Sequence, residues 1–175
     1  GCGPNEPGPS GCDYECGSTL EFDECGVCGG GNECQGCPDG FVESSLSTSE
    51  NIVCLPELFD YNQSTMQASY LFYDVNIAGN AVSSNDWVGA FNGEICVGAQ
   101  EWNLEQCGGG ICSITLMGFD GNYFTQGYLM SGQFPSFKIY DNSENIYYEA
   151  FPSTNYPYAN LSFFPIDSLS TIETI

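Results

Sequence analysis

Seven of the eleven cysteines fall within the first 37 residues, and this density constrains the fold more than any other feature of the chain. A segment so rich in Cys, Gly and Pro cannot bury enough apolar surface to fold around a core, so covalent cross-links must hold it. Disulfides persist in oxidising compartments, so we expect an extracellular or cell-surface protein. The candidates for disulfide bonding are all the cysteines: Cys2, Cys12, Cys16, Cys25, Cys28, Cys34, Cys37, Cys54, Cys96, Cys107 and Cys112.

Disulfides are favoured over zinc because the two CxxC pairs are too close together. Only five residues separate Cys28 from Cys34, whereas paired zinc knuckles are usually about 15 to 20 residues apart. An odd number of cysteines leaves at least one without a partner in the chain, and Cys2 is the candidate for a bond to another chain or to a cysteine upstream of Gly1. Near the sheet region, either Cys107 pairs with Cys112 or Cys96 pairs with one of them.

Composition divides the chain near Cys54. Residues 1–54 hold eight cysteines and three aromatic residues, whereas residues 55–175 hold the remaining 22 aromatic residues. We therefore expect a disulfide-stapled segment over 1–54 and a domain with a hydrophobic core over 55–175.

Alternating patterns predict short strands throughout the second part. Leu71, Tyr73, Val75 and Ile77 alternate with Phe72, Asp74 and Asn76, which is typical of a strand with one buried face. Asn92-Gly93 is a strong signal for a two-residue hairpin. The other predicted strands lie at 86–91, 95–99, 113–117, 136–140, 145–150 and 161–166. The pattern predicts a mainly β fold, an antiparallel β-sandwich of immunoglobulin-like or jelly-roll-like type.

The charge of the chain excludes several classes of partner. One Lys stands against 23 Asp and Glu, for a net charge of −22 at pH 7. Nucleic acids and anionic membranes are bound through Lys and Arg, so neither is an expected partner. No run of about 18 apolar residues is present, so membrane insertion is not expected either.

Catalytic side chains are scarce. The chain has no His, no Arg and only Lys138 as a cation, so we expect a protein that is not an enzyme. A pair of carboxylates would suffice for a glycosidase, and the best cluster is Glu94, Glu101 and Glu105 near two Trp residues. Solvated turn residues are the preferred interpretation of these three.

Calcium is the more credible ligand, although no cofactor is required. Asp141, Ser143 and Asn145 resemble the first half of an oxygen-ligand loop without its later Gly and Glu. Asp120 with Asn122, and the acidic residues between Asp13 and Asp39, are equally open alternatives. Turn formation explains the same residues equally well.

Three further features concern the surface. Asn62 and Asn160 fit the N-glycosylation sequon. The segment from Ser162 to Ile175 is expected to end the sandwich as an edge strand or to pair with another subunit. An exposed aromatic patch is expected among the following residues: Tyr147, Tyr148, Tyr156, Tyr158, Phe163 and Phe164.

Two stretches resemble parts of known extracellular proteins. Residues 23–34, Asp-Glu-Cys-Gly-Val-Cys-Gly-Gly-Gly-Asn-Glu-Cys, resemble a cysteine-rich module found in ADAMTS-type proteases and in surface proteins of marine bacteria. Residues 86–93, Asp-Trp-Val-Gly-Ala-Phe-Asn-Gly, are similar to part of a β-sandwich domain in surface proteins of Bacteroidota-like marine bacteria. The resemblance implies an extracellular module and carries no catalytic residues.

These observations together predict a non-catalytic extracellular structural protein, a subunit or repeat of a surface filament or adhesive appendage that associates with itself. The alternative is a calcium-assisted carbohydrate-binding module of a larger secreted protein, with a glycan as its partner.

Overall fold

The computed structural model describes residues 12–13, 18–21, 28–29, 36–49 and 51–171, in two compact units that divide between Cys37 and Pro38. In the first unit a disulfide joins Cys12 to Cys28, and the backbone N–H of Cys12 donates to the Leu20 carbonyl. This confirms that a disulfide staples the cysteine-rich segment.

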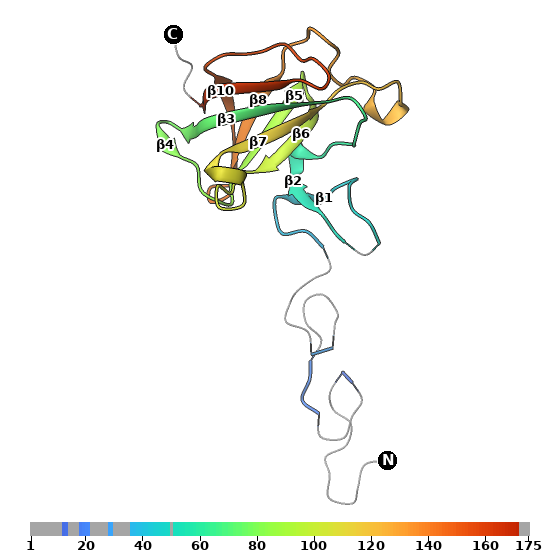
Figure 1. The fold of residues 1–175 in the computed structure, drawn as a ribbon. Helices are drawn as coiled ribbons and strands as arrows, with labels where there is room; N and C mark the ends of the chain where they lie inside the picture. The colour runs from blue at the N-terminus through green and yellow to red at the C-terminus, as the bar shows by residue number, and fades with distance from the viewer. Residues whose placement is uncertain (1–11, 14–17, 22–27, 30–35, 50, 172–175) are drawn as a thin grey trace, which may run out of the picture. The chain divides into compact units, whose positions relative to one another are not determined.

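The second unit is built almost entirely from strands, which confirms the mainly β prediction (Figure 1). Its described helices are short 3-10 turns, and no helix in the described part of the chain is long and apolar enough to span a membrane. The elements in chain order are β1 (Phe41–Glu43), β2 (Cys54–Pro56), η1 (Glu57–Phe59), β3 (Gln67–Ile77), β4 (Asn80–Ala81), β5 (Trp87–Asn92), β6 (Ile95–Glu101), η2 (Gly108–Gly110), β7 (Cys112–Met117), η3 (Tyr123–Thr125), β8 (Ser136–Asp141), β9 (Ile146–Pro152) and β10 (Phe163–Ser170).

Eight strands form one curled sheet in the order β4-β3-β10-β9-β8-β5-β6, with β7 also paired to β3. Strand β9 pairs with β8 along most of its length and with β10 only through Phe151 and Pro152. The sheet therefore bends at β9 into two leaves that face each other. A sandwich-like core results, with β3, β7 and β10 on one side and β5, β6 and β8 on the other.

The pairing of β10 corrects the expectation for the end of the chain. Strand β10 lies between β3 and β9 and runs parallel to β3, with Phe163 opposite Ser69 and Ser170 opposite Asn76. It is an interior strand of the sheet and not a free edge. The sandwich is thus antiparallel at every described strand pair except this one.

The buried face of β3 also differs from the predicted one. Tyr70 and Phe72 are buried, whereas Tyr73 is 56% exposed. Period two holds to Phe72, then Tyr73 and Asp74 are both exposed, and Val75 returns to the core. The predicted set of Leu71, Tyr73, Val75 and Ile77 thus mixes the two faces of the strand, since Tyr73 is exposed and Val75 is buried. Alternation could not assign the buried face because the aromatic residues Phe72 and Tyr73 are adjacent and point to opposite faces.

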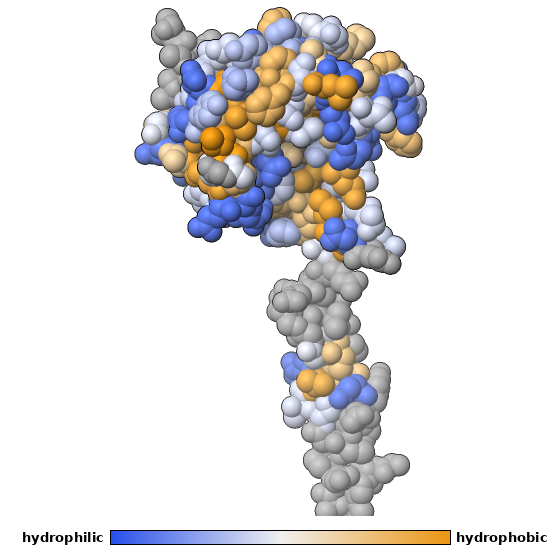
Figure 2. Space-filling view, in the orientation of Figure 1, coloured by the Kyte–Doolittle hydropathy of each residue, from blue (hydrophilic) through white to orange (hydrophobic). Residues whose placement is uncertain are grey.

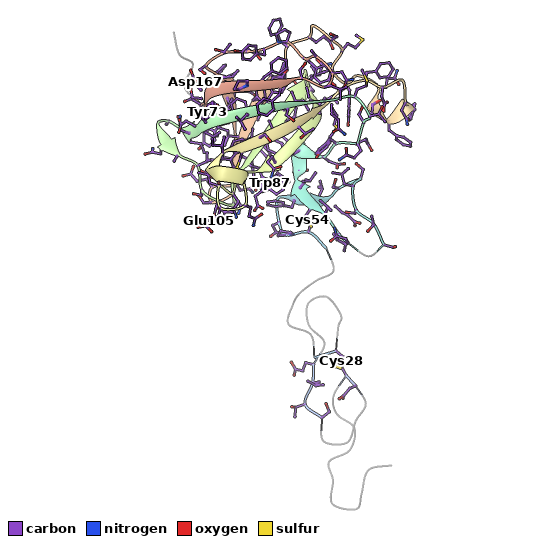
Figure 3. All side chains as sticks on the ribbon, viewed as in Figure 1. Cys28, Cys54, Tyr73, Trp87, Glu105 and Asp167 are labelled. Carbon is purple, nitrogen blue, oxygen red and sulfur yellow. A yellow bond between two sulfur atoms is a disulfide. The ribbon has the colours of Figure 1, made fainter. Side chains whose placement is uncertain are left out.

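Composition predicted that residues 38–54 belong with the cysteine-rich segment, but they belong with the sheet. A second aromatic cluster explains the difference. The Phe41 ring meets Trp87 and Tyr140 edge-on, at centroid distances of 6.3 and 5.7 Å. Phe59 lies fully buried against Phe91 in the same cluster. The β1–β2 hairpin and η1 therefore cover the outer face of the β5–β8 leaf, beside the labelled Trp87 (Figure 3).

Candidate functional site

The cysteines of the sheet region settle the alternatives left open by the sequence. Cys107 is bonded to Cys112, and Cys96 is a free, buried thiol whose S–H donates to the Gly98 carbonyl at 3.4 Å. Burial raises the pKa of Cys96 to about 12. Cys96 is thus not a disulfide cysteine, contrary to its place among the candidates, because its side chain points into the aromatic cluster away from the Cys107 loop.

This free thiol also removes the parity argument for a bond to another chain. With Cys96 unpaired, the ten other cysteines can pair among themselves. Cys37 and Cys54 are each disulfide-bonded. Cys2, Cys16, Cys25 and Cys34 lie outside the described residues.

The predicted calcium loops are turns whose carboxylates already accept hydrogen bonds. Asp141 Oδ1 accepts from the backbone N–H groups of Ser143 and Glu144 and from the Ser143 hydroxyl. Asn145 Oδ1 accepts from the Tyr140 hydroxyl. In the part of the chain that the structure describes, no three His, Cys, Asp or Glu residues gather into a group that would hold a metal ion.

Asp120 is a hub of hydrogen bonds between two loops. Its Oδ1 accepts from the Asn122 N–H and the Thr125 hydroxyl, and its Oδ2 accepts from the N–H and hydroxyl of Thr65. These bonds hold its pKa well below the usual range for Asp, the largest contribution coming from Thr125. Asn122 in turn caps η3 by accepting from the Phe124 N–H.

Two of the three glutamates of the glycosidase hypothesis lie far apart. Glu94 and Glu101 lie at opposite ends of β6, seven residues apart and so about 23 Å along an extended strand. Paired carboxylates of glycosidases lie within about 10 Å of each other. Glu105 lines a small pocket at Trp102, whose side chain is 2% exposed.

Both predicted glycosylation asparagines use their amides within the fold. Asn62 Nδ2 donates to the Phe124 carbonyl at 3.4 Å, and Asn160 Oδ1 accepts from the Gln67 N–H at 2.8 Å. Asn160 thereby fixes the start of β3.

The predicted aromatic patch is wrong for most of its members. Tyr158 is buried, Tyr147 packs against Tyr140, and Tyr156 stacks on Phe164 at 5.1 Å. Of that set, only Phe163 is largely exposed.

The exposed aromatic side chains lie instead at loop positions that the sequence analysis did not single out. Residues 61–66, 118–135 and 152–162 meet at one end of the sandwich, and we call them the neutral loop end. Gly118 donates to the Met66 carbonyl, Tyr158 donates to the Gln133 carbonyl, and Leu161 donates to the Gln67 carbonyl. The exposed large apolar side chains here are Phe119, Tyr123, Phe124, Met130, Phe134 and Leu161.

Charge is almost absent from this surface. The three loops contain one of the 23 acidic residues, Asp120, and not the chain's lysine. Lys138 lies elsewhere, ion-paired with Glu149 across β8 and β9 and 5.5 Å from the centroid of the Phe91 ring. In the sequence, this surface is marked by the near absence of charged residues from 61–66, 118–135 and 152–162, on a chain of net charge −22.

Tyr123 and Phe124 are the most prominent side chains of the neutral loop end. They are 81% and 66% exposed, and their rings meet edge-on at 5.9 Å. Figure 2 shows apolar side chains at the surface among hydrophilic ones on the body of the sandwich. Because Asp120 and Asn122 hold η3 in place, the two rings are presented from a fixed turn.

A shallow pocket lies at the same loop end. Its volume is about 310 Å³, and its lining includes Asn92, Phe119, Gln126, Tyr128, Met130 and Gln133. Comparison of the chain with protein-family models, with characterised proteins and with solved structures finds no match.

Proposed function

We propose that the protein is a non-catalytic extracellular structural protein, a subunit or repeat of a surface filament or adhesive appendage. Several disulfides together with a β-rich fold are consistent with a non-cytoplasmic protein. The observation that carries the proposal is the neutral loop end, where exposed aromatic side chains gather and charge is nearly absent.

Self-association of a chain of net charge −22 is opposed by its own charge at most of its surface. The repulsion between two copies is weakest where the contacting surfaces of both carry no charge. Interface cores are depleted in charged residues and enriched in Tyr, Phe and Met, which is the composition of this surface. The neutral loop end is therefore the surface through which one copy would contact another.

The test is assembly of the purified chain with and without charge on the two prominent rings. Sedimentation velocity at rising concentration and negative-stain electron microscopy should show species larger than the monomer. The double variant Tyr123→Asp/Phe124→Asp should stay monomeric, since it places carboxylates at the contact.

A matched control is Tyr73→Asp, which changes an aromatic side chain of similar exposure on β3 (Figure 3). The control should assemble like the parent. A parent that is monomeric at all concentrations, or a double variant that assembles as well as the parent, would contradict the proposal.

The pocket favours a second candidate, the carbohydrate-binding module. Aromatic and aliphatic walls with amide groups are typical of sites that bind sugars. In the calcium-assisted form of this candidate, calcium would bind at the turns of Asp141 and Asp120. The carboxylate of Asp141 accepts three hydrogen bonds within the fold, and that of Asp120 accepts four. Loss of glycan binding on addition of a chelator would support the calcium-assisted form.

A further inference from the structure

The pocket of the neutral loop end has walls that are fixed by hydrogen bonds before any ligand arrives. Asn92 Nδ2 donates to the Gly127 carbonyl at 2.8 Å, which ties the β5–β6 turn to the loop. The Met130 N–H donates to Gln133 Oε1 at 2.7 Å, and the Asn62 N–H donates to the Tyr128 hydroxyl at 2.6 Å. A preformed pocket costs less ordering on binding than a loop that must close.

The same bonds determine which polar groups remain for a ligand. Asn92 uses its amide nitrogen and keeps its Oδ1 oxygen, whereas Gln133 uses its Oε1 oxygen and keeps its Nε2 nitrogen. Gln126 is exposed and lines the pocket. The pocket thus offers both hydrogen-bond donors and acceptors, none of them charged.

The apolar part of the lining comes from Phe119 and Met130, which are 40% and 56% exposed. An aromatic ring and a thioether present a surface on which the C–H face of a sugar ring packs. Neutral amides beside such a surface match the hydroxyl groups around the ring, which both donate and accept.

Charge excludes other ligand classes. No lining residue is a cation or a carboxylate. Glu94, exposed in the turn after Asn92, adds negative charge nearby, so an anionic ligand would be repelled. Asp120, the only carboxylate of the neutral loop end, accepts four hydrogen bonds and is occupied in joining the loops.

We propose that this pocket binds one or two units of a neutral saccharide without calcium. Phe119 and Met130 would contact the sugar face, and Gln126, Gln133 and Asn92 would bond its hydroxyl groups. The inference rests on the second candidate function and names its site, ligand class and metal independence. Self-association through Tyr123 and Phe124 is a separate property.

The experiment is isothermal titration calorimetry of the full chain with neutral hexasaccharides of glucose, mannose, galactose and N-acetylglucosamine, and with oligogalacturonate as the anionic probe. We expect binding of at least one neutral probe, none of oligogalacturonate, and no change with excess EDTA. Phe119→Ala and Gln133→Ala should each weaken binding by about tenfold.

The variant Tyr123→Asp/Phe124→Asp should retain saccharide binding, which separates the pocket from the contact surface. Tyr73→Ala is the control for a distant aromatic side chain, and near-UV circular dichroism checks that each variant is folded. Three results would overturn the inference: no neutral probe binds, EDTA abolishes binding, or both pocket variants bind like the parent. None of them bears on self-association, which sedimentation measures independently.

Discussion

Gly98 of β6 lies directly against the carbonyl oxygen of Thr115 in β7. A Cβ at Gly98 would come within 2.2 Å of that oxygen, far inside van der Waals contact. The two strands share no ladder of hydrogen bonds, so this contact is a close approach between the two leaves of the sandwich. Closure of the sandwich therefore depends on the absence of a side chain at residue 98.

Gly98→Ala should destabilise the protein by at least about 2 kcal/mol, because backbone must move to admit the methyl group. Gly108→Ala is the matched control, since a Cβ there meets nothing within 4 Å and no positive φ is involved. Its effect should stay within about 1 kcal/mol. Urea unfolding followed by fluorescence measures both, and equal stabilities would show that the leaves are not in contact here.

Cys96 should be a free thiol, as it is in the described part of the chain. Burial and its raised pKa, about 12, keep the reactive thiolate scarce at neutral pH, so native protein should react slowly with a thiol reagent. Unfolding without reductant should then expose a thiol that peptide mapping assigns to Cys96. A map that places Cys96 in a disulfide, or labelling as fast in the native protein as in the unfolded one, would refute this assignment.

The Asp120 network should make stability depend on acid pH. The folded-state pKa lies below the unfolded value of about 3.9, so the stabilisation is present above about pH 4 and is lost as pH falls further. Asp120→Asn should unfold more easily than the parent at neutral pH, with the difference shrinking in acid. Thermal unfolding from about pH 7 to 2 measures this.

The control for the Asp120 experiment is Asp167→Asn, which changes an exposed carboxylate of β10 (Figure 3). It should track the parent at every pH. A constant difference between Asp120→Asn and the parent across the range would show that the carboxylate charge is not what holds the loops.

Salt should promote assembly of the protein. The repulsion between copies comes from a net charge of −22. Its range shortens as ionic strength rises, because salt screens the charges. The contact itself, at Tyr123 and Phe124, involves no ion pair and so is not weakened by salt. Sedimentation velocity in increasing NaCl should show a larger assembled fraction, and dissociation by salt would point to an electrostatic contact elsewhere.

The strands themselves were largely predictable from the sequence. The period-two runs at 95–99 and 136–140 fall within β6 (Ile95–Glu101) and β8 (Ser136–Asp141), and the Asn92-Gly93 hairpin forms with Gly93 at φ 63°. Alternation reports which residues share a face, and a turn signal joins neighbours in the chain. Alternation and turn signals each depend on residues that are close in the sequence, so the sequence alone is enough to predict them.

The arrangement of the strands was not predictable in the same way. Nothing in residues 163–170 indicates that they insert beside β3 in parallel, because alternation does not identify the partner strand. Strand β1 and the first residue of β2 were assigned to the cysteine-rich segment, since composition averages over residues and does not show that Phe41 packs on Tyr140.

The candidate site was missed because exposure of aromatic side chains depends on the tertiary fold. Tyr158 and Phe124 both lie in loops and look alike in sequence, yet the first is buried and the second is 66% exposed. The low charge of residues 118–135 was visible in the sequence. It gained meaning only when the fold brought residues 61–66 and 152–162, which carry no charged residue, to the same end.

Hydrogen–deuterium exchange, comparing concentrated with dilute protein, locates the surface through which one copy contacts another. We expect a concentration-dependent gain of protection confined to residues 118–135 and their neighbours at 61–66 and 152–162, and absent in Tyr123→Asp/Phe124→Asp. No gain of protection at any concentration, or a gain located at β4 or at the β1–β2 hairpin, would contradict the assignment of the neutral loop end as the contact surface.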